Sequence, residues 1–231
     1  MPSRAARPTA AVFLDFDGTI SRGDLVDGIL EQYAAPAWRN VEEEWRAGRL
    51  GSRACLSQQM ALVRASPREI DELIDRVGID SGLVPLLDAC AHVGTPVHIV
   101  SDGFDYCIRR LLARLPPDAQ RLLADVTVSA SHLEPALHGL WWTRFTFPSI
   151  ACAHGCATCK PAVMRALAPA GTRTVFVGDG LSDLYAAVEA DTVFAKDALE
   201  TYCVDHALTH VRYETLADVA ACIEEDMRLR A

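Results

Sequence analysis

The sequence predicts an α/β protein: a Rossmann-like parallel sheet with a small helical cap inserted after its first strand. Three short apolar runs alternate with segments whose apolar residues recur at helical spacing. Such alternation implies parallel strands joined by right-handed crossovers. One stretch, from about residue 24 to 78, has helical patterns but no convincing strand. This stretch is the expected cap.

The three apolar runs are the expected strands. They cover residues 11–14, 97–100 and 174–177, and each leads into a polar turn that carries a carboxylate. Nearly continuous apolar runs are typical of strands that are covered on both faces. In open parallel sheets, ligands bind beyond the carboxyl ends of the strands. We therefore expect the three polar turns to meet at one site.

Helical stripes fill the remaining core and the insert. Apolar residues three and four apart share a helix face. Those of the core are Leu83, Leu86, Leu87 and Cys90; Ile108, Leu111, Leu112 and Leu115; and Leu216, Val219, Ala220 and Ile223. The predicted organisation is a loose arm over 1–9, a core over 10–22 and 80–231, and a helical cap over 23–79, placed to act as a lid.

The composition narrows the class of protein. The chain has 231 residues, of which 50% are hydrophobic, so a large folded core is expected rather than disorder. No apolar run approaches membrane-helix length, and the N-terminal segment lacks the apolar region of a signal peptide. We expect a cytoplasmic protein with reduced cysteines. The net charge of −9 argues against non-specific binding to nucleic acid or anionic membranes, but not against a local anion site.

The strongest motif is Asp15-Phe16-Asp17-Gly18-Thr19, directly after the first expected strand. Two carboxylates two residues apart can face one site, where one attacks as a nucleophile and the other donates or accepts a proton. Gly18 permits a tight turn and a close approach to an anion, and Thr19 adds a hydroxyl group. The alternative is an Asp-rich turn that only caps a helix.

A second motif, Gly178-Asp179-Gly180-Leu181-Ser182-Asp183, follows the third strand. Asp179 and Asp183 share a face if a helix begins near Leu181. Paired carboxylates suit Mg²⁺, which prefers hard oxygen ligands. The alternative for Asp183 is a charge that favours a helix N-terminus.

Ser101 and Lys160 complete the candidate set. The hydroxyl of Ser101 and the amides of Asp102 and Gly103 follow a buried strand, where they can hold phosphate oxygens. Lys160 precedes Pro161, a favoured first helical residue, which places its ammonium at the mouth of the site. Taken singly, each has an ordinary reading, a strand-end serine and a surface lysine. Their combination and order give them weight.

In this order the motifs resemble the four motifs of the haloacid dehalogenase-like phosphatases, over about residues 12–197. The resemblance implies that Asp15 is the nucleophile and forms an aspartyl-phosphate. It implies that Asp17 is the general acid and base, that Thr19 and Ser101 hold the phosphoryl group, and that Lys160 steadies the charge of Asp15 and the phosphate.

The resemblance also implies a Mg²⁺ cofactor. Its ligands would be Asp15, the backbone carbonyl of Asp17 and Asp179, with Asp183 in support. The helical insert resembles the phosphoserine-phosphatase-like branch of the family.

A narrower resemblance, over 101–105, 156–161 and 194–197, is to the methionine-salvage 2-hydroxy-3-keto-5-methylthiopentenyl-1-phosphate phosphatases. Phosphoethanolamine and phosphocholine phosphatases also carry cysteines before the lysine. Asp102 stands where the methionine-salvage type is expected to have glycine, which adds a carboxylate beside the phosphate pocket and bears on substrate preference.

Four residues before this lysine have metal-like spacing: Cys152, His154, Cys156 and Cys159. Three thiols and an imidazole can hold Zn²⁺ tetrahedrally. Structural zinc sites usually join two separated pairs, whereas these residues lie within eight positions. The alternative is a reduced structural cluster at the substrate rim.

The leading hypothesis is therefore a Mg²⁺-dependent phosphomonoesterase acting on a small phosphate ester, either the methionine-salvage ester or phosphoserine, phosphoethanolamine or phosphocholine. A phosphotransferase of the same fold is the enzymatic alternative. A signalling receiver domain also uses Asp, Ser or Thr and Lys around Mg²⁺, but a stable phospho-switch gains nothing from Asp17. A non-catalytic zinc-bound scaffold is the fourth hypothesis.

Overall fold

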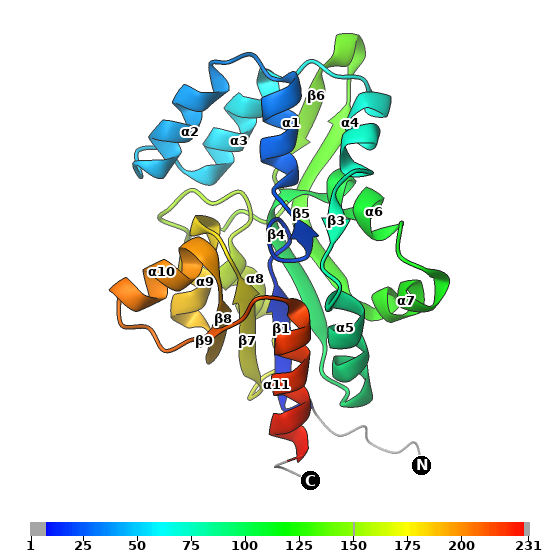
Figure 1. The fold of residues 1–231 in the computed structure, drawn as a ribbon. Helices are drawn as coiled ribbons and strands as arrows, with labels where there is room; N and C mark the ends of the chain where they lie inside the picture. Colours follow the sequence, from blue (N-terminus) through cyan, green and yellow to red (C-terminus); the bar gives the residue numbers. More distant parts are fainter. Residues whose placement is uncertain (1–7, 150, 229–231) are drawn as a thin grey trace.

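The computed structural model describes residues 8–149 and 151–228, and side chains as far as residue 225. Most of the arm expected over 1–9 lies outside the described residues. The predicted fold class is confirmed: Figure 1 shows a largely parallel sheet flanked by helices, with a group of helices at one end of it.

The main sheet has seven strands in the order β6-β5-β4-β1-β7-β8-β9. Neighbouring strands are parallel, except that β6 runs antiparallel to β5. The expected strands at 11–14 and 174–177 are β1 and β7, which pair in the centre of the sheet. The bounds are β1 Ala10–Leu14, β4 Val97–Phe104, β5 Thr127–Pro135, β6 Trp141–Arg144, β7 Arg173–Gly178, β8 Thr192–Ala195 and β9 Val211–Arg212.

Helices cover both faces of the sheet, which explains the continuous apolar sequence of β1. Val12 and Leu14 pack into the core cluster formed with α5, α6 and α11, whereas Ala11 and Phe13 pack into the cluster formed with α8, α9 and α10. Because Phe13 is fully buried, Phe13→Ala would cost about 3–5 kcal/mol. The bounds are α5 Leu83–His92, α6 Asp105–Leu112, α7 Pro117–Leu122, α8 Lys160–Leu167, α9 Leu184–Glu189, α10 Asp197–Asp205 and α11 Leu216–Arg228.

Strand β4 corrects one sequence expectation. The expected strand ends at Val100 and gives way to a polar turn, but β4 continues through Ser101 to Phe104. The strand stays in the sheet because β5 runs alongside it and pairs Ser131 with Phe104, after a register irregularity that begins at Val100. Helix α6 then starts at once, so Ser101 lies on a fixed strand and not on a loop.

The helical insert lies between two short strands, β2 (Ser21–Arg22) and β3 (Gly78–Ile79), which pair antiparallel. Its helices are α1 Leu25–Tyr33, α2 Trp38–Arg46, α3 Ser52–Ala61 and α4 Pro67–Ile74. Helix α4 begins where its sequence indicates, because Ser66 and Glu69 form a capping box and proline follows Ser66. The Trp141 indole on β6 donates to the Ala65 carbonyl at 2.9 Å, which ties the insert to the sheet.

Among the described residues, no helix combines the length and apolarity needed to cross a membrane.

Candidate active site

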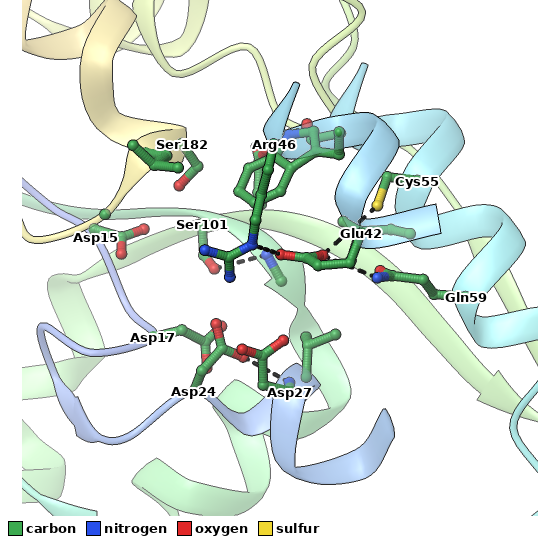
Figure 2. A pocket seen from close by; sticks show the side chains of 18 of the residues that line it. Asp15, Asp17, Asp24, Asp27, Glu42, Arg46, Cys55, Gln59, Ser101 and Ser182 are labelled. Atoms are coloured by element: carbon green, nitrogen blue, oxygen red, sulfur yellow. Dashed lines mark hydrogen bonds and ion pairs between the residues drawn. The ribbon is translucent and has the colours of Figure 1, made fainter. Parts of the chain in front are cut away.

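A cavity of about 260 Å³ lies between the helical insert and the carboxyl ends of the central strands. Figure 2 shows side chains from both parts turned toward it. The core contributes Asp15, Asp17, Ser101, Asp102, Gly103, Asp179 and Ser182, and the insert contributes Asp24, Asp27, Glu42, Arg46, Ser52, Cys55 and Gln59. The three polar strand ends therefore meet, as the parallel sheet requires.

Lys160 holds the candidate nucleophile. Its Nζ donates to Asp15 Oδ1 at 2.6 Å, to Asp183 Oδ1 at 2.5 Å and to Ser182 Oγ at 3.1 Å. The Lys160 side chain is 1% exposed, so it lies beneath the site and not at its mouth as the sequence suggested. The reason is that its ammonium reaches inward from the start of α8 to the carboxylates of Asp15 and Asp183.

Burial sets the charge states of this pair. Burial alone would lower the pKa of the Lys160 ammonium, but the carboxylates of Asp15 and Asp183 raise it, and the ammonium stays charged. Burial also raises the pKa of Asp15 well above its ordinary value. The neighbouring Asp183 adds to that rise, while Lys160 opposes it.

Asp17 is held where the chain enters the insert. Its Oδ1 accepts a hydrogen bond of 2.9 Å from the backbone N–H of Leu25, the first residue of α1. Burial raises the pKa of Asp17 well above its ordinary value, and Asp24 raises it further. A carboxyl with a raised pKa keeps its proton nearer to neutral pH and suits a proton donor.

Gly18 and Thr19 form the contact between the first and last motifs. Gly18 has φ +79°, and a Cβ added there would lie 2.1 Å from Asp179 Oδ2, so both the backbone angle and the space require glycine. Thr19 Oγ1 donates to Asp179 Oδ1 at 2.7 Å. The Tyr213 hydroxyl lies 3.3 Å from Thr19 Oγ1; sequence analysis missed it because no motif surrounds it.

An acidic group is placed to hold a metal ion. Carboxylate oxygens of Asp15, Asp179 and Asp183 all lie within 4.8 Å of one another. Burial, together with Asp183, raises the pKa of Asp179 to about 7. Asp183 Oδ2 accepts from the backbone N–H groups of Asp179 and Gly180, each at 3.0 Å, so Asp183 also shapes the loop that carries Asp179.

Strand β4 presents its polar end to the same cavity. The Gly103 N–H donates to Ser101 Oγ at 2.9 Å, and both residues line the cavity. A Cβ on Gly103 would lie 2.5 Å from Asp17 Oδ2, so glycine is required for this close approach. The carboxylate of Asp102 turns toward Ser52 and Thr158.

The insert supplies polar residues that sequence analysis did not single out. Arg46 Nε lies 2.8 Å from Glu42 Oε1, and Gln59 Nε2 donates to Glu42 Oε2 at 3.0 Å. Figure 2 shows the Arg46 guanidinium reaching into the cavity. Burial raises the pKa of Asp27 to about 7, with Asp24 and Glu42 adding to the rise. Single polar residues on short amphipathic helices resemble ordinary solvated positions, so no sequence signal marked them.

Residues 152–159, here called the cysteine segment, contribute to the lining of a separate cavity together with Tyr185. The ring of His154 stacks on the Tyr185 ring with centroids 3.7 Å apart, and the thiols of Cys152, Cys156 and Cys159 are free. Within the described ranges, the group of side chains close enough to share a metal ion is the acidic one. Zinc binding by the cysteine segment stays a prediction.

Comparisons with known proteins agree with this architecture. The model of the haloacid dehalogenase-like hydrolase family matches residues 12–187. A 2-hydroxy-3-keto-5-methylthiopentenyl-1-phosphate phosphatase of Geobacillus thermodenitrificans is 29% identical over 213 residues, which are 90% of this chain and 92% of the relative. One of Bacillus cereus (strain B4264) is 28% identical over 222 residues, 95% of this chain and 98% of the relative.

Solved structures show the same fold. A substrate-bound phosphoserine phosphatase has a TM-score of 0.65 at 18% identity, covering 93% of this chain and 97% of its own. The phosphoserine phosphatase of T. onnurineus has a TM-score of 0.67 at 14% identity, covering 94% and 95%. Since the family model matches most of the chain and the motif residues converge as the family requires, this protein belongs to the haloacid dehalogenase-like hydrolases.

Proposed function

We propose that the protein is a Mg²⁺-dependent phosphomonoesterase that hydrolyses a small phosphorylated metabolite through an aspartyl-phosphate on Asp15. The observation that carries the proposal is the convergence of Asp15, Asp17, Lys160 and Asp179 around one cavity. Phosphoryl transfer needs positioning and charge neutralisation above all, and these residues supply both.

In the first step, a carboxylate oxygen of Asp15 attacks phosphorus while the bond to the ester oxygen breaks. Lys160 fixes the orientation of the attacking carboxylate through its 2.6 Å hydrogen bond to Oδ1. Asp17 gives its proton to the departing alkoxide, so the leaving group departs as a neutral alcohol. The backbone hydrogen bond from Leu25 holds Asp17 in place for this transfer.

In the second step, Asp17 is a carboxylate and takes a proton from water. That water attacks the phosphorus of the aspartyl-phosphate, the bond to Asp15 breaks, and inorganic phosphate leaves. Ser101, Thr19 and the amides of Asp102 and Gly103 hold the phosphoryl oxygens in both steps. For this role the Thr19 hydroxyl and the Gly103 N–H exchange their acceptors in the free protein, Asp179 Oδ1 and Ser101 Oγ, for phosphoryl oxygens.

The charges of the site support a divalent cation. When ionised, the carboxylates of Asp15, Asp179 and Asp183 and the Lys160 ammonium sum to −2, and oxygen donors are the ligands that Mg²⁺ prefers. Asp15, Asp179 and the backbone carbonyl of Asp17 would hold the ion, with Asp183 in support. When bound, the ion supplies positive charge that offsets the carboxylates and the phosphoryl oxygens.

We propose 2-hydroxy-3-keto-5-methylthiopentenyl-1-phosphate as the substrate and the cytoplasm as the location. The support is that the relatives named for this ester align with nearly the whole chain. The helices of the insert, with boundaries at 23–79, act as the cap that closes over the leaving group and excludes water; residues 10–22 and 80–231 form the core. Phosphoethanolamine or phosphocholine is the second candidate, because Asp24, Asp27 and Glu42 line the cavity and would offset a cationic leaving group.

The test is phosphate release with Mg²⁺ from a panel of esters: the methionine-salvage ester, phosphoserine, phosphoethanolamine and phosphocholine. We expect the highest kcat/KM on the first, and release from none by Asp15→Asn. A higher kcat/KM on a cationic ester would favour the second candidate. If the wild type released no more phosphate from any of these esters than Asp15→Asn does, the proposed phosphatase activity would be refuted. Product analysis with added alcohols detects a phosphotransferase.

A further inference from the structure

The carboxylate of Asp102 joins three parts of the molecule beside the active site. Its Oδ2 accepts a 2.5 Å hydrogen bond from Ser52 Oγ, at the first residue of α3 in the insert. Its Oδ1 accepts a 2.9 Å hydrogen bond from the Thr158 N–H, in the loop before α8. Ser52 Oγ also accepts from the Ala157 N–H at 2.9 Å. The insert, strand β4 and the loop are thus held by one closed set of hydrogen bonds.

The backbones pack closely at the same place. The Arg53 N–H donates to the Gly155 carbonyl at 3.1 Å. A Cβ on Gly51 would lie 2.6 Å from the His154 carbonyl oxygen and 2.7 Å from that of Gly155. Only glycine at position 51 therefore allows the start of α3 to lie against this loop without displacing it.

The hydrogen bonds of Asp102 with Ser52 and Thr158 lie close in the chain to two groups of the proposed catalytic site, Lys160 and Ser101. Thr158 is 1% exposed and lies two residues before Lys160, whose Nζ contacts Asp15. Asp102 follows Ser101 on β4. Because Thr158 is packed in the interior, a change in its hydrogen bond to Asp102 shifts the start of α8, and a small displacement of a positioned group is costly to phosphoryl transfer.

We propose that Asp102 is a positioning residue: with Ser52, it couples the seating of the insert to the placement of Lys160 and Ser101. The inference rests on the proposed function for its catalytic consequence, but the hydrogen bonds stand independently. Each Asp102 oxygen already accepts a hydrogen bond from the protein, and bonds to a carboxylate are about twice as strong as neutral ones. The proposal assigns this carboxylate a role within the protein, where both of its oxygens are engaged.

The kinetic test uses Ser52→Ala, Asp102→Asn and the double variant, assayed with p-nitrophenyl phosphate and Mg²⁺. We expect kcat to fall about tenfold in each single variant, with KM changed less than about twofold. The kcat of the double variant is no lower than that of the less active single variant, because either change opens the same set of hydrogen bonds. Ser52→Thr keeps the hydroxyl and restores kcat. Ser57→Ala, exposed on the same helix, and the exposed Asp118→Asn are matched controls.

A rise in KM with kcat unchanged would show that the Asp102 carboxylate contacts the substrate. Multiplying effects in the double variant would show that Ser52 and Asp102 have independent roles. Either result overturns the proposal. Hydrogen exchange of the Ala157 and Thr158 amides gives a readout without activity. We expect exchange at least about tenfold faster in Ser52→Ala and Asp102→Asn. Unchanged exchange refutes the coupling, whereas a wild-type protein that releases no phosphate refutes only the proposed function.

Discussion

Lys160 Nζ lies 2.6 Å from Asp15 Oδ1, although 145 residues separate the two in the chain. The same ammonium lies 2.5 Å from Asp183 Oδ1. The buried cation lies between two carboxylates, fixes the orientation of the proposed nucleophile Asp15 and offsets the repulsion between the carboxylates. Its removal therefore affects folding and catalysis together.

Lys160→Met should lower the free energy of unfolding by about 3 kcal/mol, because removing one partner leaves buried carboxylates without their cation. Urea denaturation at pH 7 measures the loss. We also expect kcat to fall at least about a hundredfold, since a charge that stabilises the transition state is gone. A variant as stable and active as the wild type would show that the ion pair contributes neither stability nor catalysis.

Asp15→Asn should abolish phosphate release without lowering the melting temperature. The amide is a poor nucleophile, so we expect a loss of at least about a thousandfold. Folding is kept because the amide has the size of the carboxylate and an oxygen that can accept from Lys160 Nζ, while Asp183 remains as the counter-ion of Lys160. Near-normal turnover in this variant would refute the nucleophile.

Asp17→Asn should slow the hydrolysis of alkyl phosphates by about 10²–10⁴-fold, because their alkoxide leaving groups need a proton. An aryl phosphate such as p-nitrophenyl phosphate has a leaving group that needs none, so its first step is spared. We expect a burst of nitrophenol equal in amount to the enzyme. Turnover then stops, since the aspartyl-phosphate can no longer be hydrolysed without Asp17 as the base. Rapid quench detects the burst; equal slowing of both esters, with no burst, contradicts the role of Asp17.

Removal of divalent cations with EDTA should stop turnover, and Mg²⁺ should restore it. Asp179→Asn should raise the Mg²⁺ concentration for half-maximal activity at least about tenfold, because it removes an ionised oxygen ligand. The exposed Asp205→Asn is the matched control. Full activity of the wild type in EDTA would contradict the proposed cofactor.

Asp27 should make stability depend on pH. Its pKa is about 7 in the folded protein, against an ordinary 3.8, because burial and Asp24 disfavour the charge. Between these values the folded chain keeps a proton that the unfolded chain has lost, so stability falls as pH rises. The melting temperature of Asp27→Asn should therefore exceed that of the wild type at pH 8.5, and the difference should be smaller at pH 5. A pH-independent difference contradicts this linkage, and Asp118→Asn is the control.

The sequence predicted the parts that depend on local pattern. The apolar runs gave β1 and β7 because strands covered on both faces need continuous apolar residues, and parallel topology alone brings Asp15 and Asp179 to one edge. The match of the family model to residues 12–187 confirms the family relationship, which the sequence could indicate because the motifs are short and follow the strands.

What could not be predicted depends on distant pairing. Strand β4 continues past Val100 because β5 runs alongside it, and β5 is not among the three strands expected from the apolar runs. Lys160 is buried because its ammonium pairs with Asp15, 145 residues away in the chain. The hydrogen bond between Ser52 and Asp102 likewise joins residues 50 apart. No local pattern encodes such contacts. Glu42 and Arg46 belong to the site because the insert packs over the strand ends, and that packing cannot be deduced from the residues around them.

The backbone contact between Gly51 and the carbonyls of His154 and Gly155 has a consequence for protein engineering. A chimaera that receives the helices of another hydrolase, but retains its own loop at 154–158, would set an unmatched surface against that loop. Swaps intended to change which ester is accepted should therefore transfer both segments as one unit.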